Sequence, residues 1–237
     1  MKTRFATLFA FLVCSSLALA ADWTAEYARL LGKYVTPAGV KYSEWKANAD
    51  DMKAIQAVVD GVAAAPASNA KSKEQLAFHI NAYNAWILRE ALAKYPTKSV
   101  KDTLFTFFTG NRIVVAGEKM SFNRLEKDII RPQFGEPRIH FALNCASRSC
   151  PPLRDEPYDP ARLDAQLDDQ ARGYVNSERG VKVRGEIALY SKIFDWYKDD
   201  FGGDAGVAAL MKKYRKGPST FKTVGYQDYD WGLNEAK

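Results

Sequence analysis

The chain has few of the residues that hold metals. Its 237 residues include two histidines, His79 and His140, and three cysteines, Cys14, Cys145 and Cys150. A structural zinc site takes four ligands, and no second cysteine pair is present to complete such a set. The sequence therefore predicts no metal site, and we expect no cofactor.

A strong excess of one charge is also missing. The formal net charge of +6 is mild, and the basic residues are scattered along the chain. A nucleic-acid-binding protein would show a basic patch or stripe. We therefore expect no nucleic-acid partner, and a small molecule or a peptide is the expected kind of ligand.

Long hydrophobic runs are absent beyond the N-terminus, where one short run stands. Lys2 and Arg4 precede an almost wholly apolar segment, residues 5–20, which ends in Ala18-Leu19-Ala20. This order of positive, apolar and small residues is that of a secretory signal peptide. The run is about 16 residues long, shorter than the roughly 20 that a spanning helix needs. We expect cleavage after residues 1–20 and an exported protein, periplasmic or secreted, without a membrane segment in the mature chain.

Residues 21–237 are enough for one globular domain with a substantial core. Hydrophobic periodicity and capping residues predict helices over 22–34, 44–64, 72–95, 121–130, 160–176, 191–200 and 204–215. Short strands are predicted over 112–116, 138–145, 181–183 and 187–190. The pattern predicts an α+β fold, mostly helical, with a buried central helix packed on a small antiparallel sheet.

The predicted central helix combines apolar and amide side chains. Ser72 and Gln75 form a capping-box pattern at its start, and Pro96 stops it. Its residues are apolar on nearly every side, which is typical of a buried helix. Asn81 and Asn84 nevertheless lie in its middle, and an unpaired buried amide costs about 1–3 kcal/mol. We expect both amides to have buried hydrogen-bond partners.

The segment 138–152 holds the residues most suited to chemistry. In an extended strand His140 and Cys145 would lie roughly 16 Å apart, at 3.3 Å per residue, too far to interact. A turn over residues 144–149 would instead return Cys150 to the side of His140. An imidazole there could lower the pKa of the Cys150 thiol and act as its base.

The leading hypothesis is therefore a thiol-dependent hydrolase or acyl transferase. Cys150 would be the nucleophile and His140 the base, with Asn81 or Asn84 orienting the histidine as in Cys-His-Asn hydrolases. Glu126, in the predicted helix 121–130, is a further candidate for this site, with a solvated surface charge as its alternative.

Two alternative functions remain open. The same residues could hold the core and loops of a non-catalytic, extracytoplasmic binding or structural module. Cys145 and Cys150 could also form a disulfide, because an exported chain meets an oxidising compartment. A thiol–disulfide redox protein is the second alternative, although Cys-x4-Cys lacks the tight spacing of Cys-x-x-Cys.

Several segments of the chain resemble the family catalogued as domain of unknown function 547. The matching segments span about residues 70–234 and read FHINAYNA (78–85), LE (125–126), PRIHFALNC (137–145), SCPP (149–152), SKIFDWY (191–197), DF (200–201) and YDWGLN (229–234). The resemblance implies that the shared pattern includes Asn81, Asn84, Glu126, His140, Cys145 and Cys150. Position 79 is usually tryptophan and position 127 often histidine in that family, whereas this chain has His79 and Lys127. The resemblance implies no particular reaction.

The signal-peptide hypothesis predicts the N-terminus of the exported protein. Mass spectrometry of protein purified from the extracytoplasmic fraction should find Ala21, or a residue within about two positions of it, at the N-terminus. Recovery of the chain from membranes with Met1 still attached would contradict both cleavage and export.

Overall fold

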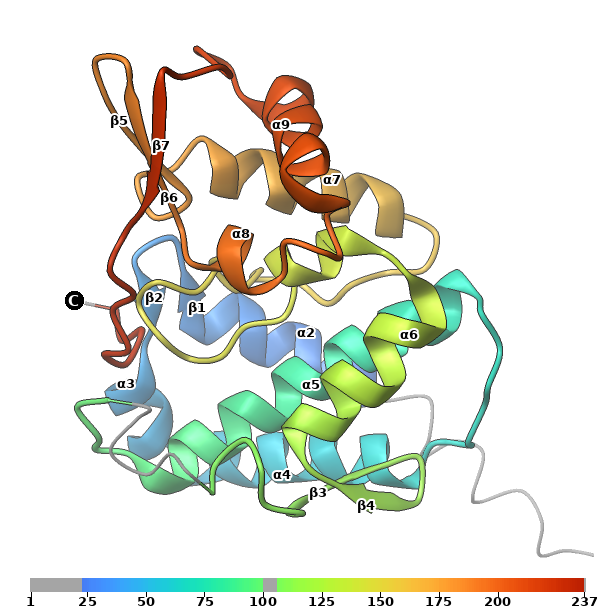
Figure 1. Ribbon diagram of the computed structural model, residues 1–237. Coiled ribbons are helices and arrows are strands. Elements are labelled where there is room, and N and C mark those ends of the chain that lie inside the picture. Colours follow the sequence, from blue (N-terminus) through green and yellow to red (C-terminus); the bar gives the residue numbers. More distant parts are fainter. Residues whose placement is uncertain (1–22, 100–105, 237) are drawn as a thin grey trace, which may run out of the picture.

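The structure is a computed structural model that describes residues 23–99 and 106–236 (Figure 1). Its helical elements are α2 (Trp23–Tyr34), α3 (Tyr42–Ala47), α4 (Ala49–Ala64), α5 (Lys73–Lys94), η2 (Arg124–Ile130), α6 (Arg131–Phe134), η3 (Pro137–Phe141), α7 (Leu163–Val175), α8 (Ile193–Trp196) and α9 (Gly203–Tyr214). The strands are β1 (Val35–Thr36), β2 (Gly39–Val40), β3 (Ile113–Val115), β4 (Glu118–Met120), β5 (Val181–Arg184), β6 (Ile187–Tyr190) and β7 (Thr223–Tyr226). The predicted signal peptide, residues 1–20, lies outside the described residues.

Two hydrophobic clusters organise these elements. The larger one is formed by α2 to α5, the β3–β4 hairpin and η2, and the smaller one by α7, α8, α9 and the β5–β6–β7 sheet. Figure 1 shows them as a lower and an upper part of the molecule. The helix η3 joins them, since Ile139 packs in the larger cluster and Phe141 in the smaller. Within the described ranges no helix combines the length and apolar character needed to cross a membrane.

The predicted α+β class is confirmed, with helices dominating and the strands confined to small sheets. These sheets are three in number among the described residues, rather than the single sheet expected. The hairpin predicted around Gly185 is present as β5–β6. The neighbouring pair β6–β7 is parallel, because the chain returns to the sheet through α8 and α9 instead of a tight turn.

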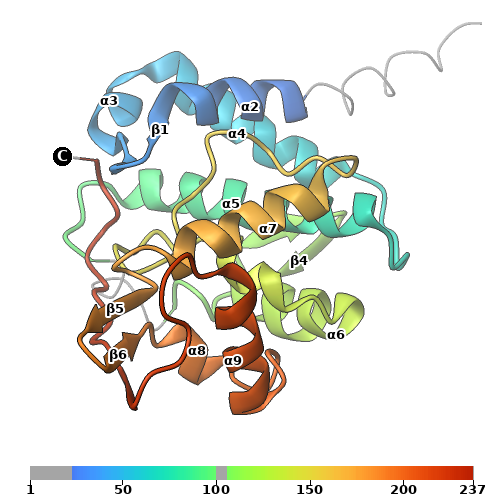
Figure 2. The ribbon, with the colours of Figure 1, turned by 90° about the horizontal axis from the view of Figure 1, so that it is seen from above.

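The central helix α5 forms as the sequence predicts. The Ser72 hydroxyl caps it by accepting a hydrogen bond of 3.3 Å from the Gln75 N–H, and the helix ends before Pro96. Fifteen of its residues are buried, which explains its apolar character on all sides. In Figure 2 the helix lies between the layer of α2 and α4 and the layer that holds α6 and α7.

The two asparagines of α5 hold neighbouring loops. Asn81 donates to the Tyr158 carbonyl and accepts from the Tyr158 N–H, both at 2.8 Å. Asn84 donates to the Ala142 carbonyl and accepts from the Asn144 N–H, both at 2.9 Å. Each side-chain amide thus pairs with two backbone groups that no regular secondary structure would satisfy.

The strand predicted over 138–145 is wrong. Residues Pro137–Phe141 form the 3-10 helix η3, and the chain then runs irregularly past Cys150. Pro137 occupies the first position of this helix, and the Glu136 carboxylate caps it by accepting from the Arg138 N–H. The apolar alternation of this segment arises because its side chains face two cores, and not from a pleated strand.

Three predicted helices also differ in detail. The segment 44–64 is two helices, because Asn48 caps α4 by accepting from the Asp51 N–H. The segment 121–130 contains the π-helix η2, and of 191–200 only Ile193–Trp196 is a regular α-helix. The widened turn of η2 and the irregular chain after α8 both adjoin the site described next.

The asparagine contacts predict a loss of stability on substitution. Asn81→Leu and Asn84→Leu each leave a backbone carbonyl and a backbone N–H without a partner, so each should lower the free energy of unfolding by at least about 1–3 kcal/mol. Urea unfolding followed by circular dichroism measures this loss. Asn69→Leu, in an exposed loop, is the matched control and should unfold like the parent. Equal midpoints for all three variants would contradict the structural role.

Candidate functional site

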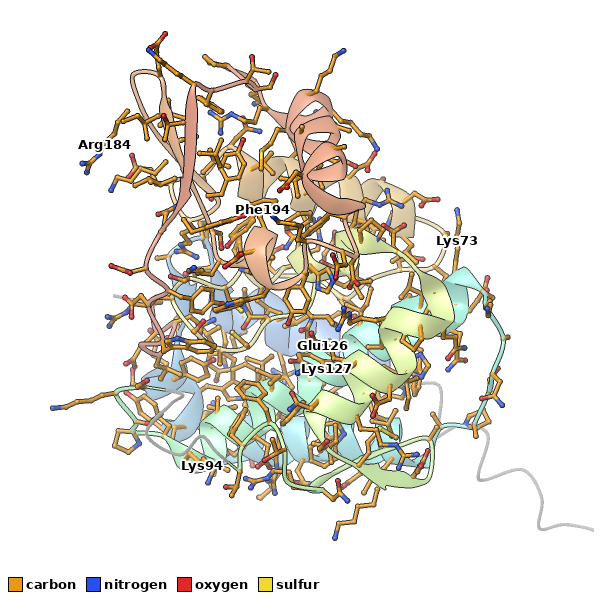
Figure 3. All side chains as sticks on the ribbon, in the orientation of Figure 1. Lys73, Lys94, Glu126, Lys127, Arg184 and Phe194 are labelled. Atoms are coloured by element: carbon orange, nitrogen blue, oxygen red, sulfur yellow. The ribbon has the colours of Figure 1, made fainter. Side chains whose placement is uncertain are left out.

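A pocket of about 470 Å³ opens where the two hydrophobic clusters meet. Such a volume suits a small molecule or a short peptide segment. Four of the predicted site residues line it, namely Glu126, His140, Cys145 and Cys150. Asn81 and Asn84 do not, because their amides are engaged with the loops beside α5. Figure 3 shows Glu126 near the middle of the molecule, on the segment that leads into α6.

The two cysteines lie on one tight loop. The Asn144 side chain shapes it by accepting from the Ala146 N–H and donating to the Pro151 carbonyl, both at 2.8 Å. Ala146 adopts a left-handed φ of 60°, a conformation that costs a non-glycine residue of order 1–3 kcal/mol and often occurs at functional sites. This fold of the loop brings the Cys145 N–H within 2.9 Å of the Cys150 Sγ. Both cysteines are free thiols in the structure.

The surroundings shift the pKa values of the two thiols in opposite directions. The hydrogen bond from Cys150 is the largest influence on Cys145, and Ser147 and Tyr229 add hydrogen bonds at Sγ–O distances of 3.1 and 3.5 Å. Together they outweigh burial and lower the pKa of Cys145 to about 7. Burial, and then the contact with Cys145, raise the pKa of Cys150 well above its usual value.

These properties favour Cys145 over Cys150 as the reactive thiol. Cys145 is partly exposed in the pocket, whereas Cys150 is buried. The thiolate that attacks or binds a ligand must be both populated and accessible. The expectation of a Cys150 nucleophile conflicts with its burial and with its raised pKa, and its sulfur instead accepts a hydrogen bond from the Cys145 N–H.

His140 belongs to a chain of polar contacts. Its Nε2 lies 2.7 Å from Asp200 Oδ2, and Arg131 binds the same carboxylate through two contacts of 2.6 and 2.7 Å. The ring also stacks on Tyr197, with centroids 3.8 Å apart. Burial is the main influence and lowers the pKa of His140 to about 4, although Asp200 acts in the opposite direction. The imidazole is therefore neutral at pH 7, and its Nε2–H donates to Asp200.

The contacts of His140 and of the thiols differ from the predicted arrangement in two ways. Asp200 orients His140, not Asn81 or Asn84, since both amides are already paired with backbone groups. The imidazole also does not produce the low pKa of a thiol, because hydrogen bonds from Cys150, Ser147 and Tyr229 do so. Among the described residues no hydrogen bond joins His140 to a cysteine.

Glu126 is buried at the wall of the pocket and is no solvated surface charge. Its Oε1 accepts a hydrogen bond of 2.7 Å from the Tyr197 hydroxyl, and its Oε2 lies 3.4 Å from the Tyr83 hydroxyl. Burial raises the pKa of Glu126, and the Tyr197 bond and the charges of Lys127 and Arg131 partly offset it. The residue lies in the π-helix η2, a rare conformation that often marks functional sites.

The site also contains polar groups that the sequence patterns did not single out. Arg131, Tyr197 and Tyr229 line the pocket, and Ser147 and Asp200 form hydrogen bonds with the lining residues Cys145 and His140. Tyr197, Asp200 and Tyr229 fall in segments that resemble the family, so the resemblance offered a signal for them. Their roles depend on contacts across 60 or more positions of the chain, which no local spacing reveals.

The neutral state of His140 is open to measurement by NMR. With only two histidines in the chain, the imidazole signals can be assigned with the variant His79→Gln. We expect His140 to titrate with a midpoint of about 4, and Asp200→Asn to lower that midpoint further, because Asp200 stabilises the charged ring.

The low pKa of His140 also predicts how stability depends on pH. A histidine in the unfolded chain titrates at about 6.5, so between pH 4 and pH 6.5 the unfolded protein binds more protons than the folded protein. The stability contributed by neutral His140 is thus present above pH 6.5 and lost as the pH falls toward 4. A midpoint near 6.5 in the folded protein would contradict this account.

Comparison with known proteins connects this site to one family. Residues 67–175 match the sequence model of the family described as "Protein of unknown function, DUF547". The matched segment runs from just before α5 to the end of α7 and includes η2, η3 and both cysteines. No significant match joins the chain to a curated protein or to a solved structure. The chain thus matches the DUF547 family over residues 67–175, the part that supplies Glu126, His140 and the two thiols.

Proposed function

We propose that the pocket is the active site of a thiol-dependent hydrolase or acyl transferase with Cys145 as the nucleophile. The observation that carries the proposal is the convergence of three hydrogen-bonding groups on a partly exposed Cys145 sulfur. The thiol of Cys150 and the hydroxyls of Ser147 and Tyr229 all reach it. A structural cysteine needs no such stabilisation of its thiolate, whereas a nucleophile does.

The proposed reaction has two steps. The Cys145 thiolate attacks a carbonyl carbon, and the bond to the leaving group breaks to give an acyl-sulfur intermediate. Water in a hydrolase, or another acceptor in a transferase, then attacks that intermediate and releases the thiolate. A neutral His140 can take the proton of the attacking group at Nδ1, because its Nε2–H is bound to Asp200. Asp200 stabilises the resulting imidazolium, which then passes the proton to the departed leaving group or to water.

Glu126 acts as a positioning residue in this proposal. Its carboxyl group fixes the Tyr197 hydroxyl at 2.7 Å, and the Tyr197 ring stacks against His140. Arg131 contributes from the other side by holding Asp200. The imidazole is therefore held by a stacked ring on its face and a carboxylate at its edge.

The rival hypothesis is a binding module that uses the same pocket without chemistry. A low thiol pKa separates the two, because binding alone does not require a thiolate. We retain export as part of the proposal, so the thiols would meet an oxidising compartment. Reactivity is accordingly measured on protein that has been reduced and then freed of the reductant.

The proposal predicts the reactivity of Cys145. The rate of alkylation of the native protein by iodoacetamide should rise with pH around a midpoint of about 7, and peptide mapping should place the label on Cys145. Cys150→Ala removes the thiol that most lowers the pKa of Cys145 and should move the midpoint toward the ordinary value of about 8.5. Cys150→Ser, which keeps a hydrogen-bonding group at this position, is the matched control and should retain a midpoint nearer to that of the parent.

The same experiment can contradict the proposal. Labelling of Cys150 in preference to Cys145 would restore the nucleophile expected from the sequence. Absence of labelling at both cysteines in the reduced, folded protein would remove the catalytic hypothesis and leave the binding module.

A further inference from the structure

One wall of the pocket is an exposed aromatic surface. Trp196 is 47% exposed, an unusual state for so large an apolar side chain. It stacks on Trp231 at a centroid distance of 5.7 Å and packs at a tilt against Tyr229 at 4.8 Å, and the Tyr229 and Trp231 rings lie 4.6 Å apart. We call Trp196, Tyr229 and Trp231 the aromatic wall. All three residues line the pocket.

The aromatic wall is joined directly to the thiol. The Tyr229 hydroxyl lies 3.5 Å from the Cys145 Sγ and 3.2 Å from the Ser147 hydroxyl. A flat ring stacked on this wall would therefore lie close to the sulfur. Exposed indole faces bind aromatic and other flat rings through dispersion and quadrupole interactions.

The pocket also contains a cation without a fixed partner. Arg131 forms an ion pair with Asp200. Lys127 is exposed, lines the pocket and makes no ion pair with any carboxylate in residues 23–99 or 106–236. Its charge acts on the neighbouring Glu126, whose burial disfavours the anionic form. Figure 3 labels both residues on the segment leading to α6. The ammonium group is thus available to an anionic ligand.

We propose that the pocket takes a small acyl compound that carries both a carboxylate and a flat ring, bound by Lys127 and by the aromatic wall respectively. The inference rests on the proposed function, because it names the substrate class of the same site. The volume of about 470 Å³ is enough for a ligand of the size of an acylated amino acid or a dipeptide. Neither Lys127 nor Trp196 takes part in the proposed chemical steps, but Trp196 contacts Tyr229, so the rates of each variant are compared with its own iodoacetamide rate.

Three alkylating reagents test the proposal with Cys145 as the reporter. Iodoacetamide is neutral, iodoacetate adds a carboxylate, and iodoacetanilide adds a flat ring to the same reactive carbon. Their rates with reduced, folded protein are measured well above the midpoint of Cys145, where the thiolate dominates. The same three rates in urea-unfolded protein give the intrinsic reactivity of each reagent.

We expect the folded protein to favour both iodoacetate and iodoacetanilide over iodoacetamide, relative to the unfolded chain. Lys127→Gln should reduce the iodoacetate advantage about 2–5-fold and leave iodoacetanilide unchanged. Trp196→Leu should reduce the iodoacetanilide advantage about 3–10-fold and leave iodoacetate unchanged. Lys119→Gln, an exposed lysine on β4 away from the pocket, is the control for charge alone.

The iodoacetamide rate serves as the control for folding in every variant. Rapid iodoacetamide labelling of Cys145 without a preference for the other two reagents would overturn the ligand class and leave the proposed function standing. Equal effects of Lys119→Gln and Lys127→Gln would also overturn it, since the effect would then come from net charge. Failure of Cys145 to react with any reagent would overturn both proposals.

Discussion

The side-chain amide of Asn84 fixes the geometry on which the rest of the site depends. It binds the Ala142 carbonyl and the Asn144 N–H, and so attaches the cysteine loop to the most buried helix of the fold. The Asn144 side chain in turn accepts a hydrogen bond from the Ala146 N–H within the loop. A strained loop of this kind persists only where surrounding contacts over-determine it. The buried amide is therefore the origin of the placement of both thiols.

The site is assembled from parts that are distant in the sequence. Glu126 comes from η2 and His140 from η3, whereas Tyr197 and Asp200 follow α8. Tyr229 follows β7, and the chain beyond it is fastened to the cysteine loop by backbone hydrogen bonds, such as that of 2.8 Å from the Arg148 N–H to the Gly232 carbonyl. The pocket thus exists only when the two hydrophobic clusters have packed against each other, which couples its chemistry to the completed fold.

Burial favours the neutral form of three titratable groups in the pocket. It raises the pKa of Cys150 and of Glu126 and lowers that of His140. Cys145 is the exception, because hydrogen bonding with Cys150, Ser147 and Tyr229 outweighs burial and lowers the pKa of its thiol. This differs from the sequence-based expectation, in which the His140 imidazole lowers the pKa of the Cys150 thiol.

The sequence by itself determined the α+β class, the central helix with its Ser72 cap, the β5–β6 hairpin and the expectation that Asn81 and Asn84 have buried partners. These features follow from periodicity, capping and the cost of an unpaired amide, which are local properties of the chain. The family resemblance added Glu126, His140 and the cysteines as members of one pattern. Only the tertiary structure decided that residues 137–141 form a 3-10 helix, that Asp200 holds His140, and that Cys145 has the lower pKa. Those properties depend on hydrogen bonds and desolvation supplied by residues far along the chain, such as Tyr229, and sequence spacing carries no information about such contacts.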